Sequence, residues 1–186
     1  MRLSAPTGTD PEQTELGERI RSRRGAVGGP FLVWLRNPAL GEHLEALGTY
    51  CLRESSLPLR LRELALLVAA RHFDAQHSWN AHLAKAIDAG VDPAALQRLA
   101  RGEEPRFSSP DEEVLHRFAS EALEGHFVGD ETFAAGLEHF GEPGLVDLVA
   151  ALGTFSMFAM ALNVFQVDLQ ADQDPPFPDI KGFRRM

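Results

Sequence analysis

The 186-residue sequence contains one cysteine, Cys51, and this scarcity excludes several kinds of site. A single cysteine cannot form a disulfide within the chain, a C-x-x-C redox pair or a multi-cysteine zinc site. Basic residues are also few, because 18 lysines and arginines oppose 27 aspartates and glutamates and leave a net charge of −9. This charge disfavours binding to nucleic-acid phosphates and to anionic membrane surfaces. We therefore expect neither nucleic acid nor membrane as a partner.

The N-terminus lacks the apolar run of an export signal, and a lone thiol suits a reducing compartment, so we expect a cytoplasmic protein. One stretch, Leu145 to Phe165, is long and apolar enough to raise the question of a membrane span. It contains Asp147, Thr154, Ser156 and Asn163. A buried core or subunit-interface helix is therefore the better interpretation.

Length and composition predict one folded domain with tails, since 44% of residues are hydrophobic and 24% are charged. We expect a loosely held N-terminal arm over residues 1–28, a helical domain over residues 29–169 and an extended, proline-rich C-terminal tail over residues 170–186. The tail also holds a small basic cluster of Lys181, Arg184 and Arg185. We expect this tail to wrap a neighbouring chain.

Apolar residues recur at helical spacing along the chain, and no alternating strand pattern interrupts them. Asp74 and Asp92 are placed to cap helices, Ser109 with Glu112 predicts a capping box, and Gly141 predicts a helix end. The predicted helices span residues 38–55, 58–73, 74–89, 92–101, 109–124, 130–141 and 143–166. The sequence thus predicts an all-α bundle of six or seven helices.

Most candidate catalytic side chains lie in the second and third of these helices. Glu63 borders the apolar face of the second helix, where a carboxylate can be drawn into the interior. The third helix carries His77, Ser78, Trp79 and His82. Ser78 and His82 are four residues apart and share a face, whereas His77 and His82 diverge by about 140°. The two histidines therefore cannot point at the same spot from one straight helix.

Metal binding and serine nucleophilic catalysis are both disfavoured by the local pattern. His72, His77 and His82 recur every five residues, whereas helical zinc ligands are spaced by three or four, so we expect no metal. Ser78 with His82 could supply a nucleophile and a base, but no glycine-rich elbow surrounds the serine. A serine in a helix is more commonly a packing or surface residue.

Three motifs in this region are recognisable: RELALLVAARH at residues 62–72, AQHSWNAH at residues 75–82 and AGV at residues 89–91. Together they resemble the carboxymuconolactone decarboxylase family, which shares its fold with alkyl hydroperoxidase D. The resemblance extends upstream to GPF at residues 29–31 and downstream to Pro176. It implies an alkyl hydroperoxidase D-like helical fold and assembly as homotrimers or homohexamers.

The peroxidase branch of this family has a glutamate, then a C-x-x-C pair, then a histidine four residues after the second cysteine. Glu63 and His82 match that glutamate and histidine, but Ala75 and Ser78 occupy the cysteine positions. Neither alanine nor serine can form the thiolate that attacks a peroxide. We therefore expect no cysteine-dependent peroxidase activity, and we interpret Cys51 as a small buried apolar residue.

The decarboxylase branch is more similar, because it has a tryptophan three residues before the histidine, as Trp79 and His82 stand here. That branch often shows tyrosine and glutamate where this chain has His77 and Ser78. This departure changes two groups that could line a pocket. The identity of the substrate therefore does not follow from the family.

The resemblance implies a cofactor-free lyase that acts on a small organic acid or lactone. Decarboxylation without a cofactor needs an electron sink in the substrate and a proton donor for the resulting enolate. We expect His82 to be that donor, with Glu63 orienting its ring and His77 assisting. We expect substrate contacts from Trp79, from Ser78 and from one arginine, for which Arg71, Arg62 and Arg53 are the candidates.

Three interpretations of function remain open at this stage. The protein is a decarboxylase or lactone-processing enzyme, a relative that uses the same pocket for another proton transfer such as isomerisation or hydration, or a non-catalytic ligand-binding oligomer. A further alternative is purely structural, because a buried Glu63–His82 pair can simply fix the register of two helices.

Overall fold

The computed structural model describes residues 1–4 and 10–178, which form helices and loops with no β-strand among them. The helices are α1 (Pro11–Arg24), α2 (Phe31–Trp34), α3 (Pro38–Thr49), α4 (Leu59–His72), α5 (Gln76–Asp88), α6 (Pro93–Ala100), α7 (Pro110–Ser120) and α8 (Asp130–Val164). Two π-helical segments, η1 (Tyr50–Glu54) and η2 (Glu121–Gly125), continue α3 and α7. The predicted all-α bundle is confirmed.

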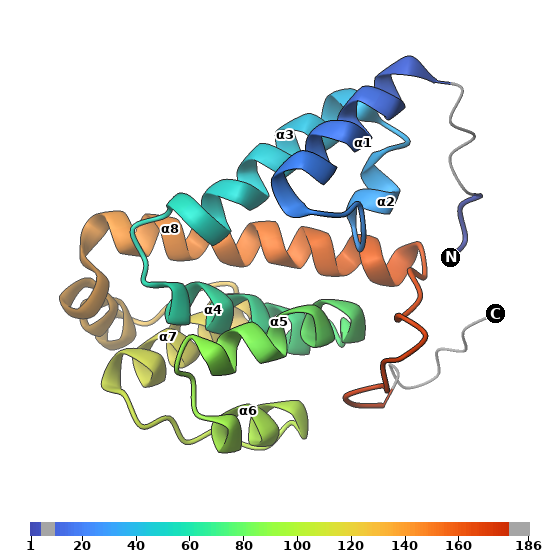
Figure 1. Ribbon diagram of the computed structural model, residues 1–186. Helices are drawn as coiled ribbons and strands as arrows, with labels where there is room; N and C mark the ends of the chain where they lie inside the picture. The colour runs from blue at the N-terminus through green and yellow to red at the C-terminus, as the bar shows by residue number, and fades with distance from the viewer. Residues whose placement is uncertain (5–9, 179–186) are drawn as a thin grey trace.

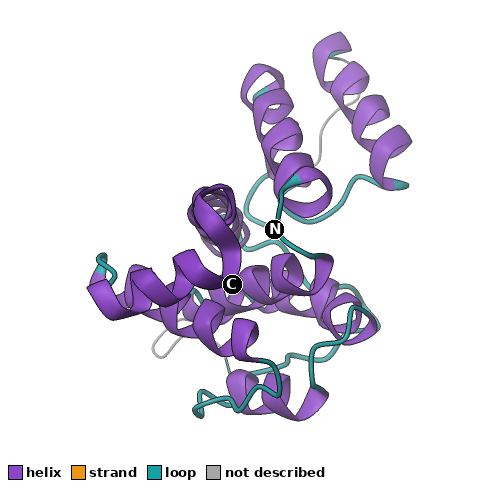
Figure 2. Cartoon of the chain, turned by 90° about the vertical axis from the view of Figure 1, so that its left-hand side faces the viewer, coloured by secondary structure: helices purple, strands orange, loops and turns teal. Residues whose placement is uncertain are grey.

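Helix α8 runs through the middle of the molecule, with α1 to α3 on one side and α4 to α7 on the other (Figure 1). Figure 2 shows the same division from a perpendicular direction. The main core lies where α4, α7 and α8 meet, and Leu64, Leu67, Leu115 and Leu148 are fully buried there. Burying a leucine side chain is worth about 1.5–3 kcal/mol, so this contact region supplies much of the stability.

Residues 11–24, expected to belong to a loosely held arm, form the packed helix α1 instead. The Asp10 carboxylate caps the helix by accepting a hydrogen bond from the Glu12 backbone N–H at 2.9 Å. Leu16 and Ile20 are buried in a second core that includes Phe158 of α8. Only these two large side chains anchor an otherwise polar helix, which is why its periodicity is weak in the sequence.

Two predicted helix caps are wrong in detail. Asp74 lies in the left-handed region at φ +50° and pairs with Arg71 instead of capping α5. At the start of α7, the Ser109 side chain makes no capping hydrogen bond. Glu112 does not complete a capping box, because it forms an ion pair with Arg60 of α4 at 2.6 Å. A local ion pair three residues apart takes the place of the first cap, and a tertiary ion pair takes the place of the second.

The two helices predicted on either side of residue 142 form one kinked element, α8. Gly141 has φ +66° and ψ 174°, a conformation that favours glycine, and Pro143 follows two residues later. Of the most apolar 18-residue stretch of α8, 61% is buried inside the molecule. This burial supports the interpretation of Leu145 to Phe165 as a core helix.

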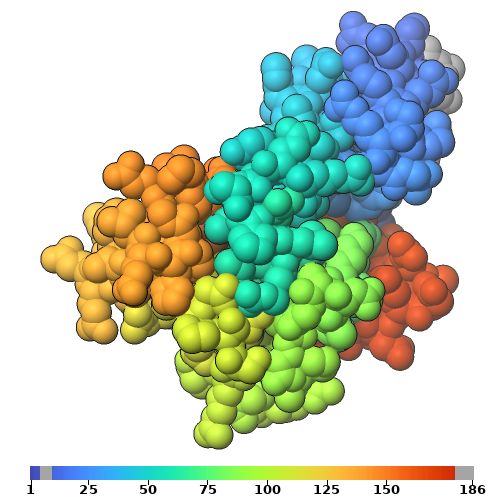
Figure 3. Space-filling view, turned by 60° about the vertical axis from the view of Figure 1, so that its left-hand side comes forward, coloured from blue at the N-terminus to red at the C-terminus, as the bar shows by residue number. Residues whose placement is uncertain are grey.

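The segment after α8 returns across α5 of the same chain (red against green in Figure 3). Asn80 donates a hydrogen bond to the Asp174 carbonyl at 2.9 Å, and Gln76 donates one to the Phe177 carbonyl at 2.6 Å. The described part of the tail thus packs on its own chain, and the expectation that the tail wraps a neighbouring chain stays a prediction. The predicted basic cluster of residues 181, 184 and 185 lies outside the described residues.

Asp147 ties α8 to the segment between α3 and α4. Its carboxylate accepts hydrogen bonds from the Tyr50 hydroxyl at 2.7 Å, the Ser56 backbone N–H at 2.6 Å and the Ser56 hydroxyl at 2.7 Å. Burial opposes ionisation, but these hydrogen bonds outweigh it and lower the pKa of the Asp147 carboxyl. The ionised side chain therefore links α8 to η1 and to the loop before α4.

We predict that Asp147→Ala lowers the free energy of unfolding by roughly 1–3 kcal/mol, because it removes hydrogen bonds to a charged acceptor. Denaturant titration followed by circular dichroism measures this loss. Glu138→Ala is the matched control, because Glu138 is an exposed carboxylate on the same helix. Equal stability of the two variants would contradict the assigned role of Asp147.

Candidate active site

Glu63 and His82 meet between α4 and α5, two consecutive helices joined by residues 73–75. Glu63 Oε2 lies 2.7 Å from His82 Nδ1, which is a short hydrogen bond. The side chains of Glu63 and His82 are only 5% and 15% exposed. A carboxylate and an imidazole are thus held together at the edge of the core, and only the imidazole reaches solvent to a useful extent.

This contact determines how the imidazole can act. An ionised carboxylate accepts hydrogen bonds and does not donate them. In a neutral His82 ring, we therefore assign the single N–H to Nδ1, where it donates to Glu63, and the lone pair to Nε2. Among the residues that the structure describes, no group hydrogen-bonds Nε2. When Nε2 takes up a proton, the buried carboxylate stabilises the imidazolium. Chemically, this arrangement can exchange a proton through Nε2.

His77 lies on another side of α5 and does not join this pair. Its ring packs against Gly29, where a Cβ atom would lie only 3.1 Å from the His77 Cε1 atom. Gly29 also has φ +57°, so glycine is required there for two reasons. Burial lowers the pKa of His77, and the ring is neutral near pH 7. The predicted divergence of the two histidines is confirmed.

Trp79 and Ser78 occupy different environments beside His82. Trp79 is 1% exposed, and its ring packs edge-on against Phe177 at a centroid distance of 5.6 Å. The sequence analysis expects Trp79 to contact the substrate. Its burial instead makes it part of the packing beneath α5. Ser78 is half-buried and lies one turn before His82 on the same face of α5.

The arginines expected to bind a substrate carboxylate have other partners. Arg71 donates to the Ala100 carbonyl at 3.0 Å and pairs with Asp74. Its guanidinium also lies 4.9 Å from the centre of the Phe177 ring. Arg62 donates to three backbone carbonyls at and just after η1. Neither side chain is available to a substrate at His82 without breaking these contacts.

Lys85 is the cation that the sequence interpretation missed. It is exposed and lies three residues after His82, which makes the two side chains neighbours on the surface of α5. The same helical spacing that joins Ser78 to His82 could have identified it. A carboxylate that approaches His82 from solvent would therefore meet a lysine ammonium.

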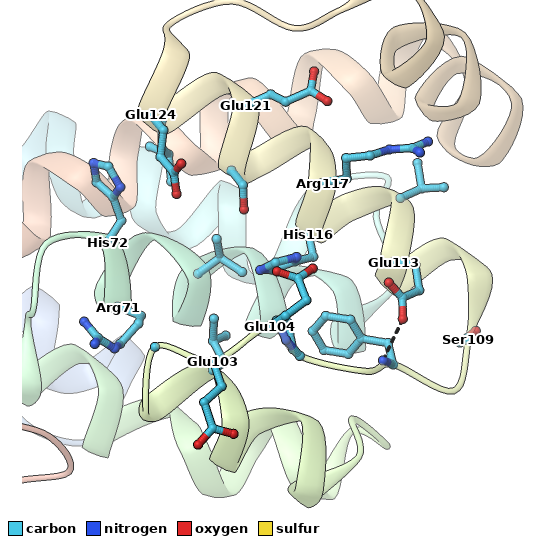
Figure 4. A pocket seen from close by; sticks show the side chains of 18 of the residues that line it. Arg71, His72, Glu103, Glu104, Ser109, Glu113, His116, Arg117, Glu121 and Glu124 are labelled. Carbon is cyan, nitrogen blue, oxygen red and sulfur yellow. Dashed lines mark hydrogen bonds between the residues drawn. The ribbon is translucent and has the colours of Figure 1, made fainter.

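A cavity of about 1290 Å³ lies elsewhere, between α4, α6, α7 and η2 (Figure 4). Neither Glu63 nor His82 lines it. Five glutamates but only two arginines line it, and Figure 4 shows Glu104 beside His116. The cavity and the Glu63–His82 pair are therefore two separate candidate sites. The acidic lining of the cavity disfavours binding of an organic acid there.

No cluster in the described part of the chain has the arrangement that a metal ion needs, namely three or more convergent histidine, cysteine, aspartate or glutamate side chains. His72 is exposed at the end of α4, and His77 and His82 face different neighbours. The evenly spaced histidines of the sequence therefore do not converge.

Comparison with solved structures defines the class of the fold. An uncharacterized peroxidase-related protein from Silicibacter sp. TM1040 has a TM-score of 0.74 and 18% identity, with 92% of each chain covered. An alkylhydroperoxidase AhpD core protein from Ralstonia eutropha JMP134 has a TM-score of 0.75 and 17% identity, with 92% of this chain and 93% of that chain covered. A variant of the debrominase Bmp8, solved with 2,3,4-tribromopyrrole, has a TM-score of 0.71 and 13% identity, with 92% of each chain covered.

These similarities show an alkyl hydroperoxidase D-like fold. The sequence model of the carboxymuconolactone decarboxylase family matches residues 38–121, the segment that runs from α3 to the start of η2 and contains both Glu63 and His82. Over this segment the chain is similar to the carboxymuconolactone decarboxylase family, and it has alanine and serine in place of the C-x-x-C pair. A comparison with curated proteins finds no significant match.

The lowered pKa of His77 predicts a loss of stability in mild acid. Burial depresses its folded-state pKa below the ordinary value of 6.5, so the unfolded chain binds more protons as the pH falls through that value. The free energy of unfolding should therefore decrease between about pH 7.5 and about pH 5.5. His77→Gln should make this decrease smaller.

Urea titration at the two pH values measures the effect. His43→Gln is the matched control, since His43 is exposed on α3. A pH dependence that is unchanged in His77→Gln, or reduced equally in both variants, would show that His77 is not responsible.

Proposed function

We propose that the protein is a cofactor-free enzyme that transfers a proton to or from a small enolisable organic acid or lactone, with decarboxylation as its leading reaction. The observation that carries this proposal is the 2.7 Å contact between buried Glu63 and His82 Nδ1, which leaves Nε2 without a partner among the described residues. The match of residues 38–121 to the carboxymuconolactone decarboxylase family supports the same reaction class.

The proposed chemistry needs an electron sink in the substrate and a proton at one carbon. Loss of carbon dioxide leaves an electron pair on the substrate carbon, which an adjacent carbonyl delocalises as an enolate. His82 in its protonated form donates a proton from Nε2 to that carbon, and Glu63 stabilises the imidazolium before the transfer. The same two residues would exchange a proton without gas release if the substrate had no carboxylate to lose.

Access to His82 would be from solvent across the exposed edge of α5. We propose that Lys85 binds the substrate carboxylate there, since it lies one turn beyond His82 and Arg71 and Arg62 are held elsewhere. Ser78, one turn before His82, would offer a hydroxyl to a carbonyl oxygen. His77 packs against Gly29 and has no part in the proposed proton transfer.

Peroxide reduction through a cysteine pair is not part of the proposal. Residues 75 and 78 are alanine and serine, and the one thiol belongs to Cys51 on η1. Cys51 is 1% exposed, and burial raises the pKa of its thiol. A buried protonated thiol is a poor nucleophile toward a peroxide.

A second candidate function, non-catalytic binding of a small ligand, is favoured by the cavity between α4, α6 and α7. Its volume of about 1290 Å³ exceeds what a small organic molecule needs. Its acidic lining suits a cationic ligand better than the acid or lactone that His82 would process. The two functions therefore predict ligands of opposite charge.

We also propose that the protein forms a homo-oligomer, a trimer or hexamer as the family implies. Helix α8 carries an exposed apolar stripe on one face, formed by Val146, Val149, Met160 and Val164, which are spaced by three, eleven and four residues. Their exposed fractions lie between 47% and 69%. Contact with a second copy of the chain would remove this stripe from water.

We predict that His82→Ala and Glu63→Ala each lower turnover by at least about 100-fold without loss of helicity, because each removes part of the proton-transfer pair. A panel of carboxylated lactones and enolisable acids is incubated with the protein in deuterated water. Carbon dioxide release and deuterium incorporation are both followed. His43→Ala, an exposed substitution on α3, is the control.

Deuterium incorporation without gas would support isomerase-like proton transfer instead of decarboxylation. Tight binding of an organic cation with no turnover of any acid would favour the ligand-binding function. Full activity of both variants would move the chemistry away from the pair, and robust peroxide turnover with a dithiol donor would overturn the argument from Ala75 and Ser78.

The oligomer is tested by substituting the stripe on α8. We expect the wild type to elute at the mass of a trimer or hexamer in size-exclusion chromatography with light scattering. Val146→Glu combined with Val149→Glu should yield smaller species, because the new charges would be buried at the contact. Leu59→Glu, at a 53% exposed position on α4, should leave the mass unchanged. A monomeric wild type would exclude the assembly.

A further inference from the structure

The described end of the C-terminal tail carries a buried aromatic residue, Phe177, that packs against the two helices of the candidate site. We define the C-terminal strap as residues 174–178, which cross the surface of α5 after the chain leaves α8. Phe177 is only 5% exposed, although the residues on either side of it in the strap are more accessible. A buried side chain in an otherwise exposed segment marks the point where the strap is anchored.

The anchor joins the two helices that carry the Glu63–His82 pair. On one side of the Phe177 ring, Trp79 of α5 packs edge-on at 5.6 Å and 78° between ring planes. On another side, the guanidinium of Arg71 on α4 lies 4.9 Å from the ring centre. Edge-on aromatic pairs and cation–π contacts are both attractive and both depend on orientation. Phe177 therefore contacts α4 and α5 at once.

Backbone contacts fix the strap over the same face of α5. The Phe177 carbonyl accepts from Gln76 at 2.6 Å, and the Asp174 carbonyl accepts from Asn80 at 2.9 Å. Gln76, Trp79 and Asn80 lie at positions i, i+3 and i+4 and so share one face of the helix. His82 follows Trp79 by three residues, about 4.5 Å along the helix axis. The strap thus contacts α5 within one helical turn of the His82 imidazole.

The other contacts of Arg71 restrict how far it can move with Phe177. Besides the Phe177 ring, it contacts Asp74 in the α4–α5 connection and the Ala100 carbonyl at the end of α6. The arginine cannot follow a displaced phenylalanine without losing these partners. Removing the ring would therefore leave a gap between α4 and α5 that the arginine does not fill.

We propose that Phe177 is a positioning residue of the site: by packing between Trp79 of α5 and Arg71 of α4, it holds His82 at hydrogen-bond distance from Glu63. The catalytic part of this inference rests on the proposed function, but the geometric part does not. A 2.7 Å hydrogen bond responds to shifts of a few tenths of an ångström in the helices that carry it. The strap is thus a remote segment of the sequence that acts on the site through helix packing.

Nuclear magnetic resonance of the histidine ring tests the geometric part. In the wild type, nitrogen-15 shifts of the His82 ring should report a proton held on Nδ1, in the hydrogen bond to Glu63. Phe177→Leu keeps an apolar anchor but lacks the aromatic ring, and it should shift these signals toward the average of the two tautomers. Phe177→Tyr keeps the ring and should restore the wild-type pattern. Phe127→Leu, at an 85% exposed position, is the matched control.

Turnover of the acid that the wild type processes tests the catalytic part. Phe177→Leu should lower kcat roughly 10- to 100-fold with a smaller change in KM, as expected when a reacting group is misplaced. Phe177→Tyr should recover most of it. Unchanged His82 signals in Phe177→Leu would overturn the proposal, as would altered signals with unchanged kcat. A wild type without turnover would instead contradict the proposed function. The ring spectra would still show whether Phe177 holds His82 at hydrogen-bond distance from Glu63.

Discussion

The hydrogen bond between Glu63 and His82 is the constraint on which the site depends. A carboxylate taken out of water costs several kcal/mol unless a partner compensates it. Glu63 is 4% exposed, and His82 supplies that partner from the next helix. The compensation fixes how α4 and α5 pack and fixes which nitrogen of the imidazole carries a proton. One contact therefore sets both a structural register and a chemical state.

The rest of the fold supports this contact at a distance. Helix α8 packs against α4 and α5 and is itself held through Asp147. Phe177 returns from the end of the chain to pack against Trp79 and Arg71. The cavity between α4, α6 and α7 has five glutamates and two arginines in its lining and lies apart from the pair. This separation is a physical reason to assign an acidic substrate to the exposed edge of α5 and not to the cavity.

Much of the helical architecture could be predicted from the sequence, because apolar periodicity and prolines at first-turn positions are local signals. The pairing of Glu63 with His82 was suggested by family resemblance and by faces that helical spacing assigns. Helix α1 escaped prediction because two buried side chains, Leu16 and Ile20, give a weak periodic signal. The partners of Arg71 and Trp79 could not be predicted, since Phe177 is about a hundred positions away in the chain.

A crystal structure with an unreactive carboxylated lactone analogue would test the central claim most directly. We predict density for the analogue within hydrogen-bond distance of His82 Nε2, its carboxylate toward Lys85, and the bond between Glu63 and His82 Nδ1 intact. Density only in the cavity lined by His116 and Glu104, or a His82 ring turned away from Glu63 when the analogue is bound, would contradict the account.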